Sequence, residues 1–148
     1  MALSRIERQI TWPTSANSIT IGDATPGTHV SEVMLFDAAD VAAAVQVRCT
    51  RTGGSDTTGD TLDVYILWST GDLDAGGGAD DFDTAEHAQF LFRLDNFTTN
   101  TPGENPATRT VPISVGAKSF KLLANWNSSS PATRTAVVFA RLNTQRAA

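Results

Sequence analysis

The chain has 148 residues, a formal net charge of −5 at pH 7 and only 18% charged residues. This length fits one domain, which can bury a core without disulfides or metals. The negative charge argues against nucleic acid as a partner, and no apolar run is long enough to span a membrane. The single cysteine, Cys49, excludes an intrachain disulfide and is expected to be a buried apolar residue.

The first half of the chain predicts an N-terminal arm followed by short strands. Residues 1–12 have weak helical spacing that stops at Pro13, so we expect an arm or a single short helical turn. Beyond it, apolar and polar residues alternate between turn-forming segments, a pattern typical of strands. Strands are expected at residues 17–22, 30–36, 41–51 and 62–68.

The second half continues this pattern but contains longer irregular segments. The longest, residues 69–86, is acidic and includes three consecutive glycines, and a second polar loop covers residues 96–108. A third loop is expected at residues 125–131, and residues 144–148 are expected to form a frayed tail. Strands are expected at residues 88–94, 111–115, 120–124 and 134–142.

Regularly spaced short strands with polar turns indicate an all-β protein. We therefore predict an antiparallel β-sandwich or jelly roll of about eight short strands with a short N-terminal arm. The predicted organisation is an arm at residues 1–12, a sandwich domain at residues 13–143 and a tail at residues 144–148.

The acidic segment is the best candidate for a metal site. Calcium prefers several oxygen ligands on a tight loop, and Asp72, Asp74, Asp80 and Asp83 could supply them. The spacing resembles part of a helix-flanked calcium loop, but Gly76 occupies a ligand position and Asp83 replaces the final glutamate. The alternative is a solvated acidic loop, and no other cofactor is expected.

Two tryptophans are candidates for contact with a partner. Trp126 lies between two asparagines in a predicted polar loop, where an exposed ring could stack on a sugar. The alternative is a ring folded back over the end of the sandwich. Trp12 precedes Pro13 and could pin the arm either to its own domain or to a neighbour.

The sequence predicts that the protein is not an enzyme. It contains two histidines, His29 and His87, and sequence alone cannot place either beside a nucleophile. The serine-hydrolase elbow, the zinc-protease helix and the phosphate-binding glycine loop are all missing from the sequence.

The arm, the body rich in threonine, serine, alanine and glycine, and the long polar loops resemble virion proteins of tailed bacteriophages. The segments ITWPTSANSITIGD and WSTGDLDAGGGADDFDT carry this character, which is closest to small capsid decoration, or cement, proteins. The resemblance implies a sandwich or jelly roll, frequently trimeric, that binds the major capsid protein or another virion protein. It also implies a location in the virion after assembly in the host cytoplasm.

Two other functions remain open at this point. One is a carbohydrate- or calcium-dependent binding module, such as an adhesion or receptor-binding domain. The other is an enzyme or an unrelated soluble domain.

Overall fold

The computed structural model describes residues 2–13, 18–22, 28–51, 61–71, 81–95, 107–127 and 135–147. Within these ranges the chain is almost entirely extended, and no described helix has the length and hydropathy needed to cross a membrane. The elements are β1 (Leu3–Ile10), β2 (Ile19–Gly22), β3 (Thr28–Val30), β4 (Met34–Leu35), β5 (Asp40–Arg51), β6 (Thr61–Gly71), β7 (Asp81–Phe82), the short 3-10 helix η1 (Ala85–His87), β8 (Gln89–Leu94), β9 (Ala107–Ile113), β10 (Ser119–Asn127) and β11 (Thr135–Ala147).

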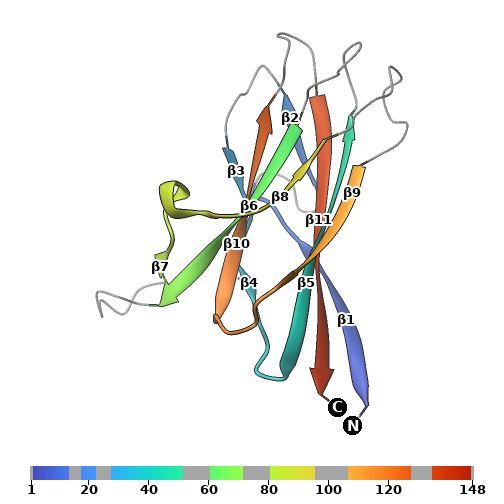
Figure 1. The fold of residues 1–148 in the computed structure, drawn as a ribbon, viewed down its shortest axis with the longest axis vertical. Coiled ribbons are helices and arrows are strands. Elements are labelled where there is room, and N and C mark those ends of the chain that lie inside the picture. Colours follow the sequence, from blue (N-terminus) through green and yellow to red (C-terminus); the bar gives the residue numbers. More distant parts are fainter. Residues whose placement is uncertain are drawn as a thin grey trace.

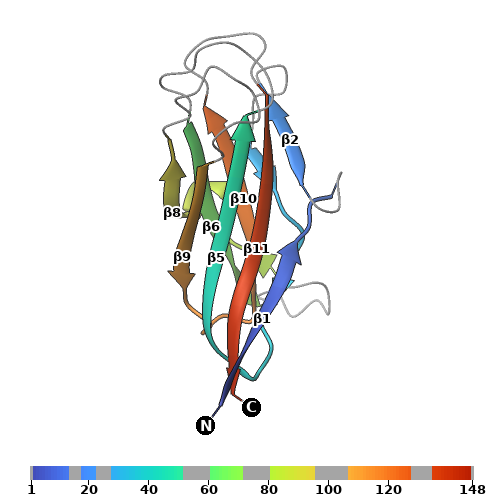
Figure 2. The same cartoon turned by 90° about the vertical axis from the view of Figure 1, so that its right-hand side faces the viewer.

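The strands form two antiparallel sheets that face each other (Figure 1). The first sheet has the order β1-β11-β5-β9, and β2 lies beside β11 on the same edge as β1. The second has the order β3-β10-β6-β7, with β4 beside β10 and β8 beside β6. Figure 2 shows the first sheet in front, with the N- and C-termini side by side at one end.

The strand order is that of a jelly roll. Three pairs of strands each lie along the same edge of one neighbour: β1 and β2 along β11, β3 and β4 along β10, and β7 and β8 along β6. If each pair is counted as one strand, the described strands number eight, and the first, eighth, third and sixth form one sheet. The second, seventh, fourth and fifth form the other, so every connection except the one from β6 to β7 and β8 passes between sheets. This arrangement of two Greek keys around a shared core is the jelly-roll form of the sandwich. The sequence prediction of fold class is therefore confirmed.

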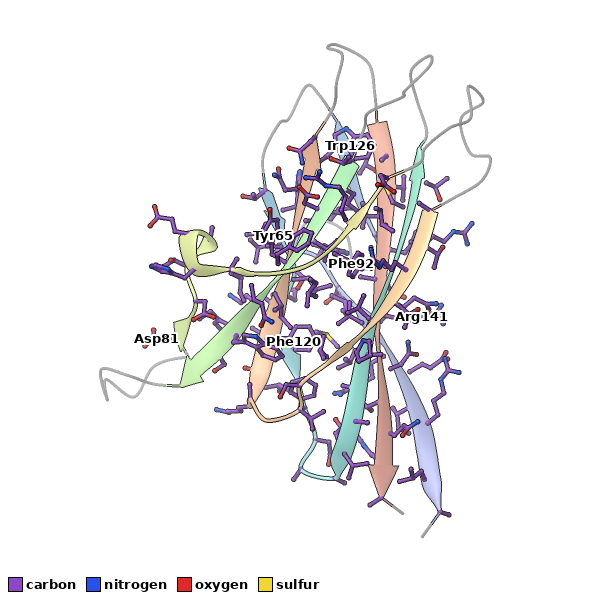
Figure 3. All side chains as sticks on the ribbon, in the orientation of Figure 1. Tyr65, Asp81, Phe92, Phe120, Trp126 and Arg141 are labelled. Carbon is purple, nitrogen blue, oxygen red and sulfur yellow. The ribbon has the colours of Figure 1, made fainter. Side chains whose placement is uncertain are left out.

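The alternating residues of each strand explain which face is buried. In β5 the odd-numbered positions from Ala43 to Cys49 are buried, while Gln46 and Arg48 between them face outward. In β11 the even-numbered positions from Ala136 to Leu142 are buried, and Phe139 faces solvent. Figure 3 shows Phe92 and Phe120, from the second sheet, in the space between the two sheets.

The N-terminal segment is a strand of the first sheet and not an arm or helical turn. β1 pairs with residues 140–147 of β11 over its whole length, and Ile10 and Trp12 lie in the core. The weak helical spacing concealed a period of two in which Ile6, Arg8 and Ile10 face inward. The same pairing continues β11 to Ala147, where the sequence predicted a frayed tail.

One buried carboxylate joins the two ends of the chain. Asp40, at the start of β5, accepts hydrogen bonds from Arg8 Nη2 at 3.2 Å and Arg146 Nε at 2.9 Å. The amide of Asp37 donates a third at 2.8 Å, and Arg8 Nη1 also reaches the carbonyl of Leu35 on β4 at 2.6 Å. Burial raises the pKa of the Asp40 carboxyl, but the hydrogen bonds from Arg146 and Asp37 outweigh it and hold the pKa below its ordinary value.

We expect Ile10→Ala to lower the free energy of unfolding by about 2–4 kcal/mol, because it removes a fully buried side chain and leaves a cavity. Leu3→Ala is the matched control, since Leu3 lies on the same strand but is exposed, and its effect should stay within about 0.5 kcal/mol. Urea unfolding followed by tryptophan fluorescence measures both. Equal effects of the two substitutions would contradict the placement of β1 in the core.

Because folding lowers the pKa of Asp40, its contribution to stability is complete above the ordinary value of 3.8 and is lost as the pH falls through the folded value. We expect Asp40→Asn to lower stability at pH 7 by about 2 kcal/mol, since two guanidinium groups lose a charged acceptor. The difference between wild type and variant should shrink below pH 4. Glu7→Gln, which removes an exposed carboxylate, is the control. A constant difference between pH 7 and pH 2.5 would show that Asp40 is not the titrating group.

Candidate functional site

The structure describes one of the four carboxylates predicted to bind calcium. The Asp83 amide donates to the carbonyl of Trp68 at 3.0 Å, and Asp83 Oδ2 accepts from the Trp68 amide at 3.4 Å, so Asp83 closes the pairing of β6 with β7. Asp72, Asp74 and Asp80 lie outside the described residues. Among the residues that are described, no three His, Cys, Asp or Glu side chains come together as metal ligands. Calcium binding stays a prediction.

The two candidate tryptophans are buried, with 3% of Trp12 and 7% of Trp126 exposed. β10 continues to Asn127, and Trp126 pairs with Leu62 of β6 on the inward face, which corrects the prediction of a polar loop from residue 125. The loop was expected from the flanking asparagines, but in a strand these two residues simply face the opposite side. Trp12 packs in the core of its own domain, and neither ring offers an open face for stacking on a sugar.

The outer face of the first sheet carries a hollow of about 340 Å³. Four adjacent strands, β1, β11, β5 and β9, contribute side chains to it in two neighbouring rows of the antiparallel register. Figure 3 shows Arg141 on this outward side, away from Phe92 and Phe120. One row holds Phe139, Arg48 and Thr108, and the next holds Gln9, Arg141 and Gln46. We call the group Gln9, Gln46, Arg48, Thr108, Phe139, Ala140 and Arg141 the outer hollow.

The face around the outer hollow is locally positive on an acidic protein. Arg141 Nη1 binds Glu7 Oε2 at 3.1 Å, and the other oxygen of Glu7 binds Arg5 at 2.7 Å. Gln9 Nε2 donates to the carbonyl of Ala140 at 2.8 Å, which fixes the orientation of its amide. Arg5, Arg48 and Arg141 thus outnumber Glu7 among the described charged residues of this face, whereas the whole chain has a net charge of −5.

The outer face of the second sheet is occupied by contacts among its own side chains. Arg93 binds Asp63 through two hydrogen bonds of 2.6 and 2.8 Å, and these bonds raise the pKa of the guanidinium group. Asn127 Nδ2 also donates to Asp63 at 3.2 Å. The ring of Phe90 packs edge-on against Tyr65, with 5.5 Å between centroids.

A second surface feature lies at the end of the sandwich that holds both termini. Leu3, the first residue of β1, pairs with Ala147 at the end of β11 and is 54% exposed. Leu35, which pairs with the first residue of β10, is also 54% exposed. Val41, the second residue of β5, is 53% exposed. We call these three residues the terminal apolar group. Figures 1 and 2 show this end of β1 and β11 projecting beyond the second sheet.

Comparisons with known proteins identify the fold alone. No protein-family model and no curated protein matches the chain. Among solved structures, latent dimeric PorU from Porphyromonas gingivalis is similar with a TM-score of 0.54 and 10% identity, over 97% of this chain and 13% of that one. The norovirus GI.7 virus-like particle gives a TM-score of 0.42 at 10% identity (97% and 32%), and the VP2 subviral particle of infectious bursal disease virus gives 0.41 at 9% (99% and 37%). The chain therefore spans well under half the length of these proteins.

Sequence reasoning missed the outer hollow because its residues come from strands far apart in the sequence. The alternation in β5 did place Gln46 and Arg48 on the face opposite Val45 and Val47. It could not show that Phe139 lies beside Arg48, because that contact depends on the pairing of β5 with β11.

Cys49 should not react in the folded protein. It is fully buried in β5, and burial raises the pKa of its thiol to about 12, so almost no thiolate forms at pH 8. We expect iodoacetamide at pH 8 to leave the native protein unmodified over hours and to alkylate it completely in 8 M urea, as read by intact mass. Rapid labelling without urea would contradict the buried position of Cys49.

Proposed function

We propose that this chain is a structural protein of a tailed-phage virion, a small decoration subunit that binds the major capsid protein and stabilises the head. In this proposal it acts by binding and not by catalysis, and it works without nucleic acid, membrane or cofactor. The subunit is a homo-oligomer, with a trimer favoured by the sequence resemblance, and it joins the virion during assembly in the host cytoplasm.

The terminal apolar group carries the proposal. Single exposed apolar side chains are ordinary on protein surfaces, and these three, from both sheets, lie at the end of the sandwich that holds the termini, where a docked partner would cover them. The hydrogen bonds of Asp40 with Arg8 and Arg146 hold the strand ends that present Leu3 and Val41. These contacts fix the strand ends before a partner docks, which lowers the cost of ordering the backbone on binding.

The jelly-roll fold supports the same conclusion. A closed sandwich with a continuous core is a stable module at this length without a metal or disulfide. A protein that coats a lattice gains overall binding strength because many copies bind one shell together, so a modest affinity at each position is sufficient.

The test is co-sedimentation with shells of the major capsid protein, prepared free of this chain from the virus that encodes it. We expect saturable binding at a fixed number of copies per shell. The triple variant Leu3→Ser, Leu35→Ser and Val41→Ser should bind at least tenfold more weakly, because it removes the exposed apolar surface without touching the core.

Phe90→Ser is the matched control, since Phe90 is an equally exposed apolar residue but lies on β8, outside the terminal apolar group. Thermal unfolding of each variant checks that the fold is kept. Shells that fail to retain the wild-type chain would overturn the proposal. Equal loss of binding by the triple variant and Phe90→Ser would show that the terminal apolar group is not the contact.

A further inference from the structure

We infer that the outer hollow binds an acidic saccharide, with a sugar ring stacked on Phe139 and its carboxylate held between Arg48 and Arg141. This site uses a different surface from the terminal apolar group, so it goes beyond the proposed function. The hollow matches such a ligand in its aromatic floor, its charge, its hydrogen-bonding groups and its size.

Phe139 gives the hollow an aromatic floor. It lies on β11, an inner strand of the first sheet, and faces outward with 42% of its surface exposed. A large ring in the middle of a sheet face, surrounded by polar side chains, offers an apolar surface flanked by hydrogen-bonding groups. Binding sites for small ligands combine these two features, and the flat ring matches the C–H face of a pyranose.

The charged groups favour an anionic ligand. Arg48 is exposed on β5 and has no ion pair or hydrogen bond among the described residues, and its register partner on β11 is Phe139. Arg141 lies in the adjacent row and already shares Glu7 with Arg5. A guanidinium group binds a carboxylate through two parallel hydrogen bonds, so Arg48 can take an incoming carboxylate without breaking an existing pair.

The uncharged groups suit sugar hydroxyls. The Gln46 amide and the Thr108 hydroxyl lie beside the two arginines and contain both donors and acceptors, whereas the Gln9 amide already donates to the carbonyl of Ala140. Hydroxyl groups of a saccharide also donate and accept, so each can pair with these side chains. A simple inorganic anion would use only the arginines.

The size of the hollow fits a short oligosaccharide. Its residues extend over four strands, and neighbouring strands lie about 4.8 Å apart, so the site is about 14 Å across. Its volume of about 340 Å³ is at the lower end of the range for small-ligand sites. The net charge of −5 on the whole chain disfavours a long polyanion, which would extend past the hollow.

The experiment is calorimetric titration of the full chain with trigalacturonate and, separately, with maltotriose. Both are α-1,4-linked trisaccharides, but only the first carries carboxylates. The buffer contains 150 mM salt and EDTA, so a calcium-dependent contribution of the acidic segment is removed. We expect trigalacturonate to bind at least tenfold more tightly than maltotriose.

Two substitutions test the residues. Phe139→Leu keeps apolar volume but removes the ring, and Arg48→Gln keeps hydrogen-bonding ability but removes the charge. Each should weaken trigalacturonate binding about tenfold, as expected for loss of one stacking or charged contact. The controls are Phe90→Leu, an exposed phenylalanine on the second sheet, and Lys118→Gln, which removes the same charge outside the hollow. Each should change the affinity less than twofold.

The inference would be overturned if neither trisaccharide bound, if the two bound equally, or if the control substitutions weakened binding as much as Phe139→Leu and Arg48→Gln. A short single-stranded oligonucleotide is the last probe. Equal affinity for it, with the same sensitivity to Arg48→Gln, would show a general anion site and would also overturn the inference. The capsid co-sedimentation uses other residues, so each proposal can fail without the other.

Discussion

The end of the sandwich that holds both termini depends on the hydrogen bonds of the buried Asp40 carboxylate. The carboxylate binds Arg8 of β1 and Arg146 of β11, so the first and last strands are tied to the start of β5 in one cluster. Arg8 also reaches the carbonyl of Leu35, which belongs to the other sheet. A buried carboxylate is stable only when charged partners surround it, and this requirement fixes the three strands in one register.

That register decides which side chains face solvent. A slip of one residue in β11 would turn Phe139 and Arg141 into the core and expose Ala140 and Leu142, so burial of the core strongly excludes it. The outer hollow is therefore a consequence of the same pairing that forms the core. Its two rows follow from β1, β5 and β9 lying in fixed positions beside β11, and no loop is needed to build it.

The sequence could predict the strands because alternation is local. The buried positions of β5 follow directly from its apolar residues, and the alternation along the chain was sufficient for the fold class. In β11 both faces carry apolar residues, so the sequence could not decide whether Val138 or Phe139 faces inward. It could not predict that Leu3–Ile10 forms a strand, because the paired residues of β11 lie at least 130 positions away in the sequence and the inward residue Arg8 is polar. Trp126 was misplaced for the same kind of reason, since its asparagine neighbours indicate a loop unless the pairing with β6 is known. Three of the predicted calcium ligands lie outside the described residues.

The topology also explains why the hollow lies on the first sheet. The segment from β7 to β8 packs on the outer face of the second sheet, where Lys121 Nζ lies 4.5 Å from the centroid of the Phe82 ring and Phe90 contacts Tyr65. No described segment covers the first sheet in this way, and its small and amide side chains leave Phe139 open. Along β11 the hollow and the residue paired with Leu3 are six positions apart, or about 20 Å. A partner docked on the terminal apolar group would therefore leave the hollow facing solvent.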